Sequence, residues 1–218
     1  MNLFSWLLSL FTPKSNEPSG WDFPAPVDSP DSPLPELPAH IPDKETEPVR
    51  GLETEIAMRN LIITADYVFV QDTRLIRNDA AAMKIWESRW PDFMPWELDT
   101  RDFSVRMSTK SLDAAQAVRT EFGQGMYVTN ACRNWPHNVS VGGKENSDHL
   151  TEDKRGNPLN ATAFDIAIAS PAFGRKLEAI AIKHGFNAIG RYPVSSFIHI
   201  SMRKPKPNGK IYQWGRWP

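Results

Sequence analysis

Two histidines and one aspartate stand out because of the segments in which they lie. Asp165 is in the middle of ATAFDIAIA, His199 is in the middle of SSFIHISM, and His149 ends a polar loop at NSDHL. A charged carboxylate within an apolar strand costs free energy unless something pairs with it. One divalent cation would satisfy all three side chains, and two imidazoles with one carboxylate leave a fourth position open, as in catalytic zinc sites. On spacing alone, a hydrogen bond between Asp165 and one histidine explains the pattern nearly as well.

The remaining histidines and the single cysteine lack this setting. His40 lies in a proline-rich stretch, His137 lies in a loop, and His184 precedes a glycine at the end of an expected helix, where a cation faces the helix carbonyls favourably. Cys132 is the only cysteine, which excludes an intrachain disulfide and a cysteine-rich zinc site. The formal net charge is −1, and such a balanced charge argues against a nucleic-acid partner.

The elements that must position these residues mix helices and strands without a strict alternation. Hydrophobic periodicity and caps predict helices over 51–62, 78–90, 111–123 (N-cap Ser111) and 170–185 (N-cap Ser170). Period-two or short apolar runs predict strands over 65–71, 102–107, 126–133, 161–169, 186–190, 197–202 and 211–214. We therefore expect an α+β fold, in which a small mixed or antiparallel sheet is flanked by helices.

The N-terminal part of the chain differs in composition from the rest. Residues 1–11, MNLFSWLLSLF, predict an amphipathic docking helix, because they are too short to span a bilayer and lack the basic start and cleavage site of a convincing signal peptide. Residues 12–48 hold ten of the nineteen prolines and predict an extended arm. One domain is expected over 51–218, and residues 1–48 are expected to dock on a larger protein assembly or on a membrane surface.

Several short motifs in the C-terminal half follow one another in an order known from one family. They are VRTEFG (118–123), TNACRNWPHN (129–138), SVGG (140–143), Ser147 with His149, AFDI (163–166) and FIHI (197–200). From about residue 103 to the end, the chain resembles the M15 zinc peptidases in their D-Ala-D-Ala carboxypeptidase and murein endopeptidase branch. The resemblance implies a D-Ala-D-Ala carboxypeptidase-like fold for this part of the chain.

The resemblance also implies roles for individual residues. His149, Asp165 and His199 correspond to the family's ligands of Zn²⁺. Arg133 and Ser147 correspond to substrate-binding residues, and the guanidinium of Arg133 would fork onto a peptide carboxylate or carbonyl. The implied substrate is a stem or cross-link peptide of bacterial peptidoglycan, and the implied location is a phage virion, the bacterial periplasm or the cell exterior.

The chain departs from the family pattern close to the expected site. The loop 150–164 between the first histidine and the aspartate is longer than usual, and Ala161 replaces a glycine. Ser201 replaces the aspartate two residues after the last histidine, and Ser196 replaces a carboxylate that some members place three residues before it. The general base is therefore unassigned. The candidates nearby in the sequence are Asp148, Glu152 and Asp153.

Two alternatives to a peptidase remain open. A non-catalytic virion or assembly protein that retains the zinc-peptidase fold would account for the missing carboxylates and for the proline-rich arm. A carbohydrate or peptide binder would account for the eight tryptophans, of which Trp135, Trp214 and Trp217 lie near the expected site or the end of the chain. Packing in the core and on the surface explains these tryptophans more simply.

Overall fold

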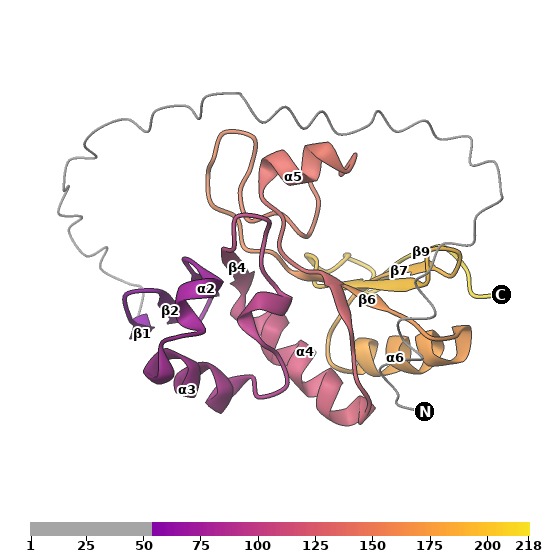
Figure 1. Cartoon of the computed structure of the whole chain (residues 1–218). Coiled ribbons are helices and arrows are strands. Elements are labelled where there is room, and N and C mark those ends of the chain that lie inside the picture. The colour runs from indigo at the N-terminus through magenta and orange to yellow at the C-terminus, as the bar shows by residue number, and fades with distance from the viewer. Residues whose placement is uncertain (1–53) are drawn as a thin grey trace, which may run out of the picture. The chain divides into compact units, whose positions relative to one another are not determined.

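The computed structural model describes residues 54–218, with side chains from residue 58 onward, and these residues form two sheets with helices around them. Figure 1 shows this mixture of helices and strands, which confirms the α+β class. The predicted docking helix (1–11) and arm (12–48) lie outside the described residues, so the three-part division of the chain stays a prediction. Within residues 54–218, no helix is both long and apolar enough to cross a membrane.

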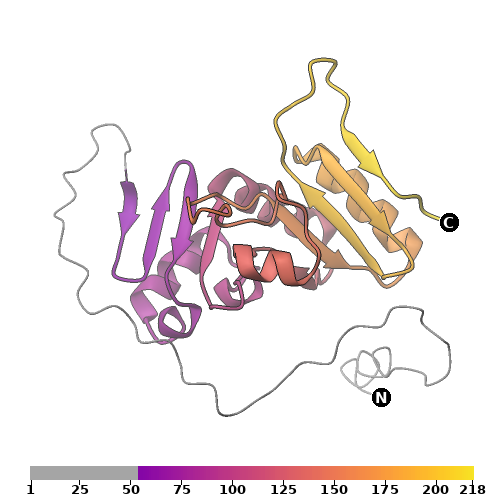
Figure 2. The same cartoon turned by 90° about the horizontal axis from the view of Figure 1, so that it is seen from above.

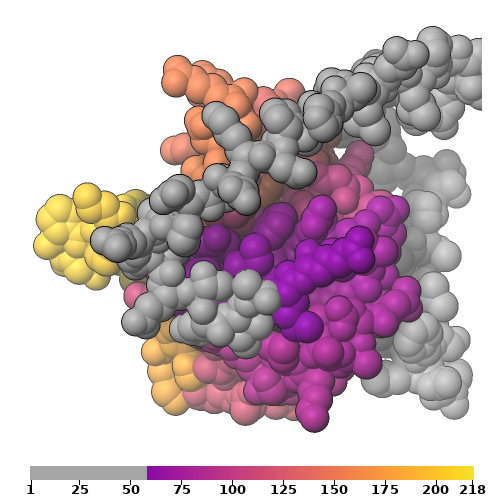
Figure 3. Space-filling model, turned by 90° about the vertical axis from the view of Figure 1, so that its left-hand side faces the viewer, coloured from indigo at the N-terminus to yellow at the C-terminus, as the bar shows by residue number. Residues whose placement is uncertain are grey.

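The first sheet is antiparallel and has the strand order β1-β2-β3-β4. Its strands are β1 (Thr54–Ala57), β2 (Leu61–Thr64), β3 (Tyr67–Val70) and β4 (Val105–Ser108). The helix expected over residues 51–62 is wrong, because this part of the chain forms β1 and the start of β2. Leu61 and Ile63 are buried with Ile62 half-buried between them, so pairing with β3 satisfies a period of two. Figure 3 looks onto the outer side of this sheet.

Three α-helices lie where the sequence predicted helices: α3 (Ala80–Arg89), α4 (Thr109–Phe122) and α6 (Pro171–Lys183). The short helix α2 (Thr73–Ile76) was not predicted. Ser170 caps α6 as expected, and Gly123 ends α4 in the left-handed conformation at φ 66°. The cap of α4 is Ser108, whose hydroxyl accepts from the Ser111 N–H, so the prediction of Ser111 as the cap is wrong.

The second sheet carries the C-terminal half of the chain and has the strand order β5-β6-β8-β7-β9. Its strands are β5 (Val128–Asn130), β6 (Ala163–Ala167), β7 (Ala188–Tyr192), β8 (Phe197–Ser201) and β9 (Tyr212–Trp214). Strands β5, β6, β8 and β7 pair antiparallel, whereas β9 pairs parallel with β7. Figure 2 shows the two sheets apart from each other, with α6 behind the second one. Apolar side chains such as Phe164, Ile198 and Ile200 are fully buried and join the core.

Two connections place the functional segments. The segment before β6 pairs with β4, where the Ser108 N–H donates to the Ala161 carbonyl over 2.8 Å, and this contact links the two sheets. The segment after β5 leads into α5 (Trp135–Ser140), a short helix at a place where the sequence predicted a loop. Figure 1 shows α5 on the opposite side of the sheets from α3, α4 and α6. Another short element, the 3-10 helix η1 (Pro95–Glu97), contacts β5.

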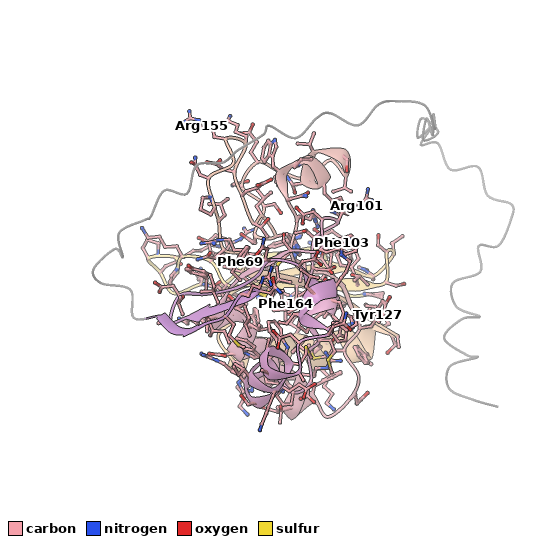
Figure 4. The ribbon with its side chains drawn as sticks, turned by 60° about the vertical axis from the view of Figure 1, so that its left-hand side comes forward. Phe69, Arg101, Phe103, Tyr127, Arg155 and Phe164 are labelled. Carbon is pink, nitrogen blue, oxygen red and sulfur yellow. The ribbon has the colours of Figure 1, made fainter. Side chains whose placement is uncertain are left out.

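The long loop between His149 and Asp165 projects away from the sheets. Figure 4 shows Arg155 at its tip, far from Phe164, which lies in the interior on β6. Within the loop, the Asp153 carboxylate accepts hydrogen bonds from the Arg155 and Asn157 N–H groups over 2.7 and 2.9 Å. The insertion is therefore closed on itself, and β6 holds Asp165 in place regardless of the length of the loop.

Candidate metal centre

One row of residues runs across all five strands of the second sheet and contains two of the three predicted ligands. Asn130 of β5 pairs with Asp165 of β6, which pairs with His199 of β8. His199 in turn pairs with Gly190 of β7, and Gly190 pairs with Trp214 of β9. Residues directly opposite each other in neighbouring strands project to the same face of the sheet. The side chains of Asp165 and His199 therefore meet, although 34 positions separate them along the chain.

The third predicted ligand, His149, comes from the loop after α5. Its backbone is held by Arg133, whose N–H donates to the His149 carbonyl over 2.7 Å. The His149 Nδ1 lies 2.7 Å from the Ala131 carbonyl oxygen and 2.8 Å from the Asn130 amide nitrogen. A carbonyl oxygen only accepts, so the contact with Ala131 requires a proton on Nδ1, and the Asn130 amide then donates to Oδ2 of Asp165, 3.3 Å away. The Nε2 lone pair of His149 is then free to face the cluster.

The donor groups of three residues converge at this point of the sheet. Nε2 of His149 lies 3.1 Å from Nδ1 of His199 and 3.3 Å from Oδ2 of Asp165. Nδ1 of His199 lies 2.8 Å from Oδ1 of Asp165. Zinc bonds of ~2.0–2.1 Å in tetrahedral geometry separate neighbouring ligand atoms by about 3.3 Å. The spacing and the chemistry of the donors thus fit one divalent ion, and all three residues are buried.

The electrostatics of the cluster favour a bound cation. Burial raises the pKa of Asp165, but the adjacent imidazoles of His149 and His199 outweigh this effect and hold that pKa below its usual range. Burial lowers the pKa of His199, but the Asp148 and Asp165 carboxylates outweigh this effect and raise it. The carboxylates therefore stabilise positive charge here, whether a proton or a metal ion supplies it.

A pocket of about 580 Å³ opens over the cluster. Both residues predicted to bind substrate, Arg133 and Ser147, line it together with the three predicted ligands. The Arg133 guanidinium lies 3.4 Å from Oδ2 of Asp165 and 3.2 Å from the Asn130 amide oxygen. The structure thus brings all five residues together, while their contacts with metal and substrate stay predictions.

Three aromatic side chains form another wall of this pocket: Tyr192, Phe197 and Trp214. The Tyr192 and Phe197 rings stack at 4.3 Å, and the Trp214 indole N–H donates to the Tyr192 hydroxyl over 2.7 Å. The Trp214 ring lies 5.3 Å from the His199 ring and covers Gly190, where a Cβ atom would come within 2.5 Å of the indole. Trp214 therefore belongs to the site.

The sequence reasoning singled out Trp214 as a candidate but missed Tyr192 and Phe197. A period of two could have found them, since Phe197 precedes His199 by two residues and Tyr192 follows Gly190 by two. Trp217 has a different role, because its ring packs on Gly174 of α6 and its indole N–H donates to Glu178 over 2.7 Å.

The three candidates for a general base lie in different places. Asp148 lines the pocket, where its Oδ2 accepts from the Ser201 hydroxyl and from Nε of Arg203, both over 2.6 Å. Glu152 instead accepts from the Trp135 N–H at the start of α5. Asp153 holds the turn of the long loop. Burial raises the pKa of Asp148, but the nearby His199 imidazole and hydrogen bonds from Ser201 and Arg203 outweigh this effect and lower it to about 2.

Comparison with known families agrees with this geometry. Residues 95–201 match the family model of peptidase M15. The matched segment runs from η1 to the end of β8 and contains His149, Asp165 and His199. No curated protein matches the chain. The match over residues 95–201 supports an M15 family peptidase.

Proposed function

We propose that this protein is a zinc-dependent peptidase that hydrolyses a peptide bond in the stem or cross-link peptides of bacterial peptidoglycan. The observation that carries the proposal is the convergence of two imidazole nitrogens and one carboxylate within 2.8–3.3 Å of one another under an open pocket. The peptidase M15 match supports a peptidase, and the donor set supports zinc. The choice of peptidoglycan rests on the resemblance of the motifs to the cell-wall branch of the family.

Zinc in such a site lowers the pKa of a bound water to ~7 and polarises the scissile carbonyl. The residues of the chain bind and orient the substrate. Arg133 offers a half-buried guanidinium that suits a peptide carboxylate or carbonyl oxygen, and Ser147 offers a hydroxyl in the lining of the same pocket. The stacked Tyr192 and Phe197 rings with Trp214 give the apolar part of a substrate a rigid surface on the other side.

Proton transfer is the step for which the pocket is least equipped. The carboxylates among its lining residues are Asp165, which belongs to the cluster, and Asp148. Asp148 is a weak base because its pKa is about 2. Ser196 and Ser201 stand where the family pattern has carboxylates. These observations favour, as a second candidate, a non-catalytic virion or assembly protein that keeps the metal centre. For either function we propose a phage virion, the bacterial periplasm or the cell exterior as location, with residues 1–48 as the docking segment.

The decisive experiment uses the full chain with purified peptidoglycan fragments. The protein is stripped with a chelator and reloaded with Zn²⁺, and the products are identified by mass spectrometry. Release of D-alanine or of a shorter peptide that depends on zinc and is lost in His199→Ala would support the peptidase. His184→Ala is the matched control, because His184 lies outside the cluster and bonds to Glu121. Stoichiometric zinc without any product would instead support the non-catalytic alternative.

A further inference from the structure

Each histidine of the cluster has one ring nitrogen that faces away from the other two predicted ligands. The surroundings of these two outer nitrogens differ. The Nδ1 of His149 has the Ala131 carbonyl at 2.7 Å. The Nε2 of His199 is buried and has no hydrogen-bond partner among the described residues. An Asp148 oxygen, Oδ2, lies 3.7 Å from this nitrogen. A movement of less than ~1 Å would bring the two atoms to hydrogen-bond distance.

We infer that Asp148 is a positioning residue that holds His199 through its Nε2–H, in place of the carboxylate that Ser201 replaces. Metal-bound histidines almost always donate their other ring N–H to a carboxylate, a carbonyl or water, which fixes the tautomer and the ring orientation. Ala131 serves His149 in this way. Asp148 serves His199, so that Nδ1 carries the lone pair toward the cluster. The inference rests on the proposed zinc site.

Asp148 is held firmly enough to orient another side chain. Its Oδ2 accepts from Ser201 and from Arg203, both over 2.6 Å, and its backbone carbonyl accepts from the Thr162 N–H over 2.8 Å. The Thr162 contact ties the residue to the segment that leads into β6, next to Asp165. The side chain is only 13 % exposed, so solvent competes little for its oxygens. A charged, fixed acceptor of this kind strengthens a hydrogen bond from an imidazole.

The contact with Asp148 favours a serine at position 201. Ser201 follows His199 by two positions on β8, so both side chains project from the same face of the strand. An aspartate at 201 would place a second carboxylate against Asp148, and like charges at this distance are costly. The serine hydroxyl donates to Asp148 instead. The carboxylate thus comes from the loop, at Asp148, and the hydroxyl that donates to it comes from β8, at Ser201.

This geometry separates Asp148 from the reacting side of the cluster. Nδ1 of His199 faces Asp165 and His149, whereas Nε2 faces Asp148. Asp148 therefore acts through the imidazole ring, and its effect is expected on metal binding as well as on turnover.

The test compares the full-length wild-type chain with Asp148→Asn and with the exchange Asp148→Ser/Ser201→Asp. Zinc affinity is measured by competition with a chromophoric chelator, and the visible spectrum of the Co²⁺-loaded protein reports the ligand geometry. We expect Asp148→Asn to weaken zinc binding about 10- to 100-fold and to alter the Co²⁺ spectrum. The exchange variant should recover most of the affinity, because it restores one carboxylate and one hydroxyl. Asp153→Asn, in the same loop, is the matched control and should leave both readouts unchanged.

The outcomes separate this inference from the proposed function. A wild-type chain that binds no zinc overturns the zinc peptidase itself. Zinc affinity and a Co²⁺ spectrum that are unchanged in Asp148→Asn overturn only the role of Asp148. If the variants do not fold, NMR of zinc-loaded wild-type protein decides: a slowly exchanging proton on Nε2 of His199 supports the inference, and coordination through Nε2 contradicts it.

Discussion

Nε2 of His149 and Nδ1 of His199 lie 3.1 Å apart in the interior of the protein. The first nitrogen carries a lone pair, because the Nδ1 proton of His149 is used by the Ala131 carbonyl. Two imidazole nitrogens at this distance either share one proton in a hydrogen bond or face a common cation. Asp165, with oxygens 2.8 and 3.3 Å from the two nitrogens, completes a site for such a cation.

Replacing either histidine of the cluster should abolish metal binding. His149→Ala and His199→Ala each leave two ligands, and a site with two ligands binds zinc far more weakly than a site with three. We expect the zinc content of the purified protein to fall from about one ion per chain to nearly none, measured by elemental mass spectrometry. His184→Ala removes a half-exposed imidazole that bonds to Glu121 and should keep the wild-type content. Full zinc content in both cluster variants would show that the ion binds elsewhere.

A methyl group at Gly190 should displace Trp214 from the pocket wall. The added Cβ would lie 2.5 Å from the indole, so the ring must move, and overpacking of this kind costs ~1–3 kcal/mol. Gly190→Ala should therefore lower the free energy of unfolding in urea and change the near-ultraviolet circular dichroism. Gly125→Ala is the control, because a Cβ there meets nothing within 4 Å. Equal effects of the two substitutions would contradict the role of Gly190.

Two serines at the start of α4 should respond oppositely to alanine. Ser108 is the N-cap, so Ser108→Ala should destabilise the protein by ~1 kcal/mol. The Ser111 hydroxyl is buried without a hydrogen-bond partner among the described residues, so its removal costs little or stabilises the fold. Thermal or urea unfolding of the two variants measures the difference. A larger loss for Ser111→Ala would restore Ser111 as the capping residue.

The stability of the metal-free protein should depend on pH through Asp148. Its pKa falls from 3.8 to about 2 in the folded state, so the unfolded chain binds more protons between these values. The contribution is fully present above pH ~4, amounts to about 2 kcal/mol, and is lost as the pH falls through about 2. Asp148→Asn should therefore show a shallower loss of stability between pH 4 and 2 in urea titrations. Parallel pH profiles for the two proteins would be inconsistent with the lowered pKa.

Features that depend on the local sequence pattern could be predicted without coordinates. Asp165 and His199 each lie mid-strand in an apolar run, and the cost of burying them unpaired is readable without coordinates. The pairing of β6 with β8 then places these two residues directly opposite each other. The helix α6 was also predictable, because Ser170, Pro171 and Gly185 mark its ends.

Other features depend on contacts that no local pattern contains. Residues 51–62 include good helix formers, yet pairing with β3 makes Leu61 and Ile63 part of a strand. The place of Asp148 depends on how the loop closes against Ser201 and Arg203, which lie more than 50 positions away. Its distance from His199 could not be predicted for the same reason, although the residue itself was among the candidates.

The parallel pairing of β9 with β7 places Trp214 in the wall of the pocket. A product of proteolytic trimming that lacks residues 212–218 would keep the His149, Asp165 and His199 trio and lose the indole beside it. Such a fragment would hold its metal but present a shallower, wetter recess to a substrate.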